Sequence, residues 1–270
     1  MDQNVPEELI DAGRGYEALF VPSQLEPWAE HLVELAGVCE GSRVLDVACG
    51  TGVLARSALA KAGANGRVVG VDAGPGMLVA AQELEPTIDW ILCGAEDLEF
   101  DDAAVDCVIS QFGMMFFDDR KKSAGEMFRV LRPGGSLAVA VWRSVEHNPA
   151  YAEVIALLEE HVGRTAADAL RLPFSLGNPD EVTAALESGG FSDITVVAKT
   201  EQAKFPSSRR MVEAELRGWL PMFGIFLTED KIEEVLIESE KTLAKYAGPD
   251  GEAIFPMSAN IFTAEKAWSS

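Results

Sequence analysis

Short apolar runs alternate along the chain with longer segments in which apolar residues recur at helical spacing. The runs are rich in valine, leucine and isoleucine, which is typical of strands buried in a parallel sheet. Alternation of such strands with helices favours an α/β fold with a doubly wound, mostly parallel sheet, and its ligand crevice lies at the carboxyl ends of the strands. The predicted strands cover residues 44–47, 67–72, 88–93, 104–110, 136–142 and 194–198, with a seventh at 253–262.

Capping residues mark where several helices begin and end. Serine, threonine, aspartate or asparagine before an apolar periodic segment predicts a helix start, and glycine after it predicts a helix end. The helices expected from these signals run from Ser23 to Gly37, over 120–130 after Asp118-Asp119, from Asn148-Pro149 to Gly163, from Asn178-Pro179 to Gly189-Gly190, and from Thr228 to Gly248-Pro249.

The segment from Val44 to Gly52 joins a buried strand to a loop of small residues, and a helical pattern resumes at Val53. Such a connection brings bare backbone close to a ligand and points free N–H groups and the positive end of a helix at it. Asp46 lies inside the strand, where a carboxylate is costly unless it orders the loop or pairs with a cationic ligand group. We therefore expect this loop to hold a cofactor.

The spacing around the loop does not by itself identify the cofactor. Gly50-x-Gly52-x-x-Ala55 satisfies the dinucleotide pattern, and Asp72 follows Gly52 by 72 − 52 = 20 residues, as a ribose-binding acid does. A carboxylate at the end of a parallel strand suits paired ribose hydroxyls. The alternative for Asp72 is a turn or helix-capping acid. NAD and S-adenosylmethionine both fit this spacing.

Two stretches resemble a known family. Leu45–Cys49 before the glycines and Arg129–Gly135 further on together resemble the class I S-adenosylmethionine-dependent methyltransferases, specifically the ubiquinone/menaquinone-biosynthesis-like branch of small-molecule enzymes. The resemblance extends from about Tyr16 to Phe191. It implies S-adenosyl-L-methionine as cofactor and a Rossmann-like sheet of seven strands, the last two forming an antiparallel edge hairpin. It also implies O-, N- or C-methylation of a small molecule.

The resemblance implies a set of cofactor-binding residues as well. It places Tyr16 over the cofactor, with ordinary packing as the alternative, and assigns the ribose to Asp72. The family's usual Gly-Asp-Ala after the third strand is replaced here by Cys93-Gly94-Ala95. Glu96, or a backbone carbonyl with the neighbouring N–H groups, is therefore expected to bind the adenine. The full expected set is Tyr16, Asp46, Ala48, Gly50, Thr51, Gly52, Asp72, Ala73, Met77, Ala95, Glu96 and Gln111.

The whole chain, residues 1–270, is expected to form a single methyltransferase domain. Its core would span 38–142, completed by edge strands near 192–199 and 252–262. Helical cap elements at 1–37, 143–180 and 206–249 would cover the crevice and set the choice of substrate.

The charge balance excludes some partners. Against 44 acidic residues there are 22 basic ones, a formal net charge of −22. Such a surface repels phosphate backbones and anionic membrane faces, so neither nucleic acid nor a membrane is expected as a partner. The four cysteines show no C-x-x-C spacing, and Cys49, Cys93 and Cys107 are expected as buried thiols in a reducing compartment. With no signal-like N-terminus and no apolar run of membrane length, the expected location is cytoplasmic.

Methyl transfer from a sulfonium requires chiefly alignment of the acceptor and exclusion of water, but a phenol or hydroxyl acceptor also needs a base. Among the three histidines, His147 follows the fifth strand and is the candidate base, the alternative being a solvated loop residue. Asp118-Asp119 could form half of a metal site. A double acid is also a common helix start, so no metal is expected.

The acceptor is expected to be a small apolar or aromatic molecule. The stretch Gly218–Leu227 is nearly all apolar, and it is expected to join the core, to line a pocket or to make a homodimer contact. Phe116 and Phe117 are expected in the core. The predicted acceptor pocket contains Phe112, Met114, Phe174, Phe223 and Phe226.

Two other functions remain open. An NAD(P)-dependent oxidoreductase would share the glycine loop, although the chain has no clear Tyr-x-x-x-Lys pair for hydride transfer. A non-catalytic protein that binds S-adenosylmethionine would share the whole fold.

Overall fold

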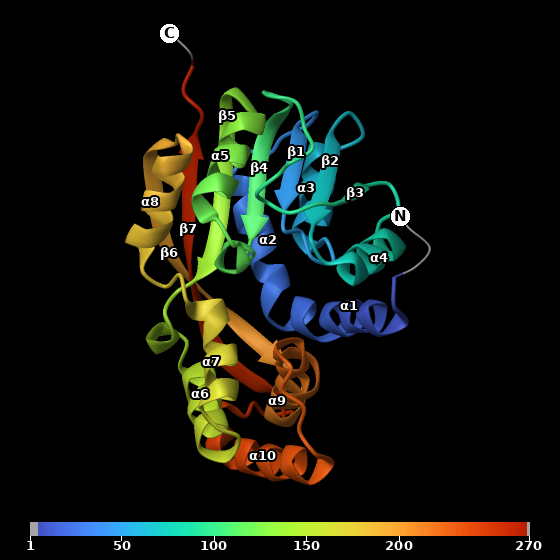
Figure 1. Ribbon diagram of the computed structural model, residues 1–270, viewed down its shortest axis with the longest axis vertical. Helices are drawn as coiled ribbons and strands as arrows, with labels where there is room; N and C mark the ends of the chain where they lie inside the picture. Colours follow the sequence, from blue (N-terminus) through green and yellow to red (C-terminus); the bar gives the residue numbers. More distant parts are fainter. Residues whose placement is uncertain (1–4, 269–270) are drawn as a thin grey trace. The chain divides into compact units, whose positions relative to one another are not determined.

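The computed structural model describes residues 5–268. Its strands and helices follow one another in chain order as shown in Figure 1. The strands are β1 (Arg43–Val47), β2 (Arg67–Asp72), β3 (Asp89–Leu92), β4 (Val105–Gln111), β5 (Leu131–Trp142), β6 (Ser192–Phe205) and β7 (Ala253–Glu265). The α-helices are α1 (Glu7–Phe20), α2 (Glu26–Leu35), α3 (Val53–Ala62), α4 (Pro75–Leu84), α5 (Arg120–Val130), α6 (Pro149–His161), α7 (Arg164–Arg171), α8 (Pro179–Gly189), α9 (Ser208–Ala214) and α10 (Glu229–Thr242).

The strands form one seven-stranded sheet in the order β3-β2-β1-β4-β5-β7-β6. The pairs β1–β2, β1–β4, β2–β3 and β4–β5 are parallel. Figure 1 shows β7 running opposite to β4. The predicted α/β class with a mostly parallel, doubly wound sheet is confirmed.

The chain divides into two compact units. The first contains the chain up to Val141, then Asn178–Lys199 and the chain from Asn260 onward. The second contains Trp142–Gly177 and Thr200–Ala259, so β6 and β7 each contribute residues to both units. Of the expected cap elements, 1–37 falls in the first unit, whereas 206–249 and most of 143–180 fall in the second.

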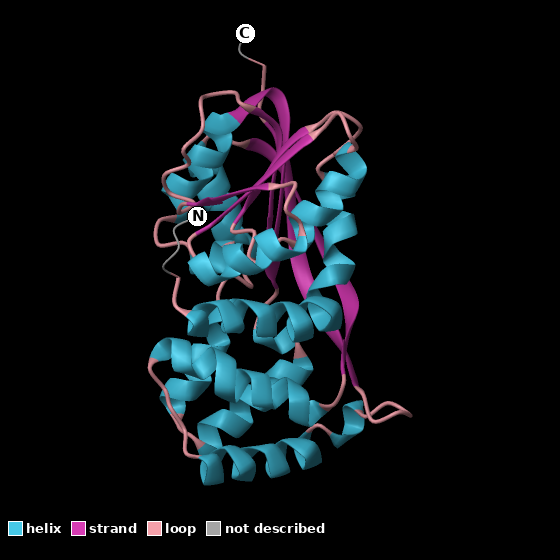
Figure 2. Cartoon of the chain, turned by 90° about the vertical axis from the view of Figure 1, so that its right-hand side faces the viewer, coloured by secondary structure: helices cyan, strands magenta, loops and turns pink. Residues whose placement is uncertain are grey.

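The core of the first unit lies between its sheet and the helices on the two sides of that sheet (Figure 2). Leu45, Val108 and Leu137, from three neighbouring strands, are fully buried. α5 and α8 pack closely because Gly189 lacks a side chain, and a Cβ there would lie 2.6 Å from Ala124 backbone. The second unit has an aromatic core instead, in which Phe205 stacks on Phe255 with ring centroids 5.9 Å apart.

Several predicted helix starts are confirmed by their capping bonds. The Asp119 carboxylate accepts a hydrogen bond from the N–H of Lys122 at the start of α5. The Thr228 hydroxyl accepts one from Lys231 at the start of α10. These side chains satisfy backbone donors that a helix leaves free in its first turn.

Ser23 does not begin a helix as expected. The chain is helical from Glu7 to Leu35, and α1 is joined to α2 by a π-helical turn over Val21–Leu25 that contains Ser23. Because α1 already precedes this turn, there is no free helix start for the serine to cap. The helix end before Gly37 is as predicted, since Gly37 has a φ of 65°.

β5 begins before the predicted strand 136–142, and Arg132–Gly135 lie within it as an irregularity. Pairing with β4 shifts register between Val105↔Leu131 and Cys107↔Ser136. The extra residues remain part of the strand because the N–H of Gly134 donates to the carbonyl of Lys266 and the N–H of Lys266 donates to the carbonyl of Gly135. This partner is 131 residues away along the chain from Gly135, so local sequence did not indicate it.

Two expectations about burial are wrong in part. Phe116 is 47% exposed, because the short 3₁₀ turn Met114–Phe116 points its two methionines inward and its phenylalanine outward. Cys49 and Cys107 are buried as expected, but Cys93 is only half-buried at the end of the short edge strand β3. Within residues 5–268, no helix is both long and apolar enough to cross a membrane.

Candidate functional site

The loop after β1 turns through left-handed backbone. Ala48, Gly50 and Gly52 have φ values of 57°, 55° and 87°. A Cβ at Gly50 would have no atom within 4 Å, whereas a Cβ at Gly52 would lie 2.3 Å from the Trp90 ring. The open side of the loop is therefore at Gly50, and Gly52 leaves room for the indole of Trp90. Because the loop leads into α3, the positive end of that helix faces the same region.

Asp72 lies at the end of β2 and connects the loop to the next turn. Its carboxylate accepts hydrogen bonds from the N–H of Gly50 at 2.8 Å and from the N–H of Gly74 at 2.7 Å. Burial raises the pKa of Asp72, opposed by these two N–H groups. Each carboxylate oxygen can accept more than one hydrogen bond, so Asp72 can bind hydroxyl groups of a ligand while it orders the loop.

Unpartnered polar atoms gather at the ends of β1 and β4. Among residues 5–268, both carboxylate oxygens of Asp46, the hydroxyl of Ser110 and the amide oxygen of Gln111 are buried without a hydrogen-bond partner. Asp46 is fully buried, and desolvation raises its pKa well above the ordinary range. Buried polar groups are normally paired, so these atoms indicate a place where a polar ligand completes the structure.

α1 lies beside the glycine loop. The Thr51 hydroxyl donates to Glu17 at 2.5 Å, and the Arg56 guanidinium donates to Glu17 at 2.7 Å and to the Thr51 carbonyl at 2.6 Å. Burial raises the pKa of the Tyr16 phenol, and the carboxylates of Asp72 and Glu17 raise it further. Tyr16 and Asp72 therefore lie in one neighbourhood, and the cofactor contact of Tyr16 stays a prediction.

The segment after β3 is held against the start of α5. Glu96 accepts hydrogen bonds from the N–H groups of Asp118 and Asp119, at 3.0 and 3.4 Å, and Ala95 is buried. The expected adenine role of Ala95 and Glu96 stays a prediction. Of the expected site residues that follow Asp72 along the chain, Ala73 is exposed and Met77 is half-buried.

The expected site residues at and just after the end of β4 lie in different environments. The Gln111 amide donates to the carbonyl of Leu25 at 3.0 Å. Phe112 has a φ of 56° and meets Trp28 edge to face, with centroids 5.6 Å apart. A non-glycine residue rarely adopts such a φ, and strain of this kind is common at ligand sites. Met114 is fully buried.

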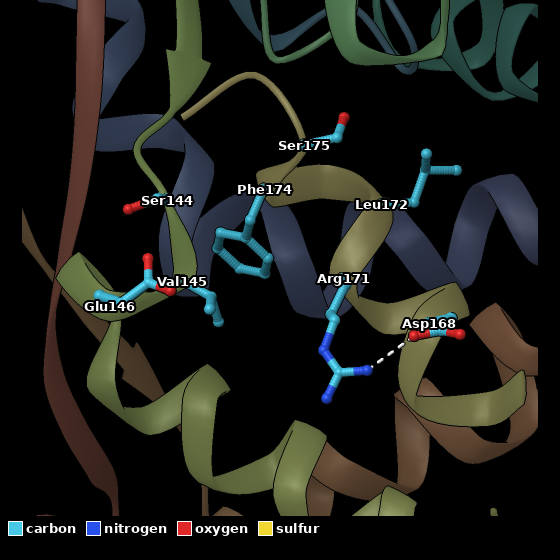
Figure 3. Close-up of a pocket in the computed structure, with 8 residues that line it drawn as sticks. All are labelled: Ser144, Val145, Glu146, Asp168, Arg171, Leu172, Phe174 and Ser175. Carbon is cyan, nitrogen blue, oxygen red and sulfur yellow. Dashed lines mark hydrogen bonds and ion pairs between the residues drawn. The ribbon is translucent and has the colours of Figure 1, made fainter. Parts of the chain in front are cut away.

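The second unit contains a hollow of about 370 Å³, to which Phe174 contributes (Figure 3). Phe174 lies beside Tyr151, with centroids 5.2 Å apart, and Arg171, three residues before Phe174, is paired with Asp168 at 2.7 Å. His147 is exposed, and its Nδ1 lies 3.1 Å from the hydroxyl of Ser144. The lining residues are Ser144, Val145, Glu146, Asp168, Arg171, Leu172, Phe174 and Ser175.

Phe223 and Phe226 do not join the core. They are 41% and 79% exposed, whereas Leu220 in the same stretch is fully buried. The 3₁₀ turn Leu220–Phe223 ends at Gly224, which has a φ of 72°. So short a turn buries only Leu220.

The sequence did not single out several residues that the structure brings to these regions. Glu17 and Arg56 belong to separate helices, and only the fold brings their charges together. Trp90 of β3 packs against Gly52 of the loop. It also packs against Gly70 of β2, and a glycine within that strand was a sign in the sequence that a bulky side chain lies close. In the second unit, Glu215 is buried, accepts a hydrogen bond from the Tyr151 hydroxyl at 3.2 Å, and has its pKa raised by burial to about 8. In the part of the chain that the structure describes, no cluster of three or more His, Cys, Asp or Glu side chains could hold a metal ion.

The fold and the loop define a class of protein. Dinucleotide-binding sheets have the strand order 3-2-1-4-5-6. Here β7 lies between β5 and β6, and a glycine loop and an acid follow β1 and β2. This combination is that of the Rossmann-like class I methyltransferases.

Comparison with known proteins gives the family. A sequence model described as the ubiE/COQ5 methyltransferase family matches residues 18–170, more than half of the chain. The chain belongs to this family.

Relatives and solved structures agree with this assignment. The chain is 30% identical over 183 residues to the ubiquinone/menaquinone biosynthesis C-methyltransferase UbiE of Cronobacter sakazakii, covering 62% of this chain and 73% of that one. It is 36% identical over 118 residues to the Proteus mirabilis protein of the same name, covering 42% and 47%. It thus spans about half the length of several curated relatives that it matches. A putative methyltransferase from an antibiotic biosynthesis pathway of Anabaena variabilis shares the fold, with a TM-score of 0.64, 17% identity, and coverage of 88% and 96%.

Proposed function

We propose that this protein uses S-adenosyl-L-methionine to methylate a small apolar or aromatic molecule. The observation that carries the proposal is the open face of Gly50, beside the Asp72 carboxylate and the unpartnered Asp46, in a chain of a methyltransferase family. Names of the relatives point to C-methylation of a quinone precursor, but an O- or N-acceptor is equally compatible with the site.

The residues of the first unit fit this cofactor. Asp72 would bind the ribose hydroxyls, and the bare backbone at Gly50 admits a ligand to close range. The carboxylate of Asp46 and the amide oxygen of Gln111 would accept hydrogen bonds from, or pair with, the cationic groups of the ligand. Tyr16, Ala48, Thr51, Ala73, Met77, Ala95 and Glu96 complete the proposed surroundings.

The bound cofactor supplies an electrophilic methyl group, and the protein orients the acceptor and excludes water. Phe112, which is buried and has a left-handed φ, is a proposed acceptor contact. Phe174, which lines the hollow of the second unit, stays a predicted contact. His147 is the proposed base for a hydroxyl acceptor. It is exposed and bonded at Nδ1, which leaves its other ring nitrogen for proton transfer.

Calorimetry tests the cofactor assignment. We expect the wild-type protein to bind S-adenosylhomocysteine and not NADH. Asp72→Ala should weaken binding by roughly 1–3 kcal/mol, because it removes hydrogen bonds to a charged group. Asp89→Ala is the matched control, since Asp89 is an exposed acid on neighbouring β3 that pairs with Arg67 at the surface. Tight NADH binding without S-adenosylhomocysteine binding would favour the oxidoreductase alternative and refute the proposal.

A further inference from the structure

One carboxylate holds α1 to the glycine loop. Glu17 accepts from the Thr51 hydroxyl with one oxygen and from the Arg56 guanidinium with the other. The Glu17 and Arg56 side chains are only 19% and 25% exposed. An ion pair that is largely screened from water and supported by a third partner is stronger than a surface pair.

The earlier part of α1 packs closely against α4 of the same unit. A Cβ at Gly13 would lie 2.7 Å from the Gly76 carbonyl of α4, so the two helices approach at backbone distance. Arg14 pairs with Glu83 of α4 at 2.7 Å, and both side chains are nearly half exposed. Glu17, in the last turn of α1, contacts the glycine loop itself.

The π-helical turn Val21–Leu25 connects α1 to α2. A π-helical turn interrupts the regular pattern of α-helical bonds, and such turns are frequent at functional sites. The carbonyl of Leu25 at its end accepts a hydrogen bond from Gln111 of β4. α2 beyond it is anchored by fully buried Trp28 and Leu32. α1 is therefore fastened twice near its C-terminal end, by Glu17 to the loop and by this turn to α2.

We propose that Glu17 is a positioning residue that latches α1 over the cofactor site, so that the Glu17–Thr51–Arg56 contact must open each time the cofactor enters or leaves. This inference rests on the proposed function, because it takes the region between Tyr16 and Asp72 as part of the cofactor site. The latch holds Tyr16 near Asp72 without itself contacting the reacting atoms. Opening occurs by local movement of the last turn of α1, next to the Val21–Leu25 turn, while the Gly13 and Arg14 contacts keep the earlier part of α1 against α4.

Glu17→Gln tests the latch, because glutamine keeps an acceptor for Thr51 but removes the charge that pairs with Arg56. In stopped-flow measurements with S-adenosylhomocysteine, we expect both the association and the dissociation rate constants to rise, each by about fivefold or more, the scale of one lost charge-assisted bond. The equilibrium affinity should change less than either rate. A purely local contact would change the dissociation rate alone.

Two further variants serve as controls. Glu83→Gln removes the other ion pair between α1 and the unit and should leave both rates at the wild-type values. Arg56→Gln should resemble Glu17→Gln, and the double variant should show no further effect, because both substitutions break the same contact. Unchanged association in Glu17→Gln would overturn the proposal. Tighter binding in that variant would also overturn it, by showing that Glu17 competes with the ligand for Arg56.

Hydrogen exchange without ligand separates this inference from the proposed function. Amides of residues 17–20, in the last turn of α1, should exchange about fivefold or more faster in Glu17→Gln than in Glu83→Gln, because the latch limits local opening there. Equal exchange in the two variants would refute the latch, whether or not the protein binds S-adenosylhomocysteine. Failure of the wild type to bind S-adenosylhomocysteine would refute the proposed function and the role of the latch in cofactor exchange, but not the effect of Glu17 on the opening of α1.

Discussion

At Gly52, the backbone conformation and a neighbouring side chain both require a residue without a side chain. Its φ of 87° disfavours any side chain, and a Cβ would meet the Trp90 ring at 2.3 Å. At Gly50 only the backbone requirement applies, because the space around it is open. The two glycines of the same loop therefore have different functions, one in packing and one in access for a ligand.

Alanine substitutions should separate these functions. Gly52→Ala should lower the free energy of unfolding by roughly 2–4 kcal/mol, combining left-handed strain with overpacking. Gly50→Ala should cost only about 1 kcal/mol, from the strain alone, but should weaken S-adenosylhomocysteine binding. Urea unfolding and calorimetry measure the two effects. If Trp90→Phe does not reduce the penalty of Gly52→Ala, or if both glycines give equal penalties, this division of roles is wrong.

For single residues, the sequence predicted which positions matter better than it predicted the contacts that they make. The spacing of Gly50, Gly52 and Asp72 was sufficient to predict a cofactor loop and an acid at the same crevice. The hydrogen bond from the Gly50 N–H to Asp72 was not predicted. Trp90 could not be linked to Gly52 from the sequence, because the contact depends on how β3 lies beside β2. The same limitation applies to Glu17 and Arg56, which are 39 residues apart.

Among the elements, the turn Leu220–Phe223 differs most from its expected role. Its hydrophobic residues suggested a buried segment, yet Phe223 and Phe226 are exposed and Leu220 alone is fully buried. Composition could not distinguish these cases, because a 3₁₀ turn ended by Gly224 has no continuous face that repeats at helical spacing. Helices with capping residues, such as α5 and α10, were predictable because the signals are local.

The exposure leads to a clear stability prediction. Phe223→Ala and Phe226→Ala should each change the free energy of unfolding by less than about 0.5 kcal/mol, as is usual for surface positions. Leu220→Ala, the matched control in the same turn, should cost roughly 2–5 kcal/mol because it leaves a cavity. Chemical denaturation measures all three. Loss of turnover in the phenylalanine variants, with folding and cofactor binding intact, would support their proposed acceptor contacts, and unfolding would show that they are part of the core.

For the molecule as a whole, burial of acids links stability to pH. Burial raises the pKa values of Asp46, Asp72 and Glu215, that of Glu215 to about 8. An acid with a raised pKa keeps its proton in the folded state at pH values where the unfolded chain has lost it. Stability should therefore fall as pH rises through this window, which for Glu215 runs from the ordinary value of 4.5 to about 8.

The Glu215 contribution can be isolated by substitution. Between pH 5 and pH 8.5 the free energy of unfolding of Glu215→Gln should fall by less than that of the wild type, the difference being of the order of a few kcal/mol. Glu187→Gln, which removes an exposed acid of α8, should follow the wild-type slope. Urea unfolding at several pH values measures the slopes. Parallel curves for Glu215→Gln and the wild type would contradict the assignment of a raised pKa to this group.

The position of β7 also has a consequence for how the protein is made. β7 pairs between β5 and β6, but it is the last of the seven strands to leave the ribosome. Until then, β5 presents an open edge and β6 has no neighbour in the sheet, and unpaired edges of this kind promote aggregation. The nascent chain must therefore keep two unpaired strand edges apart while it emerges. Interruption of translation between β6 and β7 would release a species that is especially dependent on chaperones.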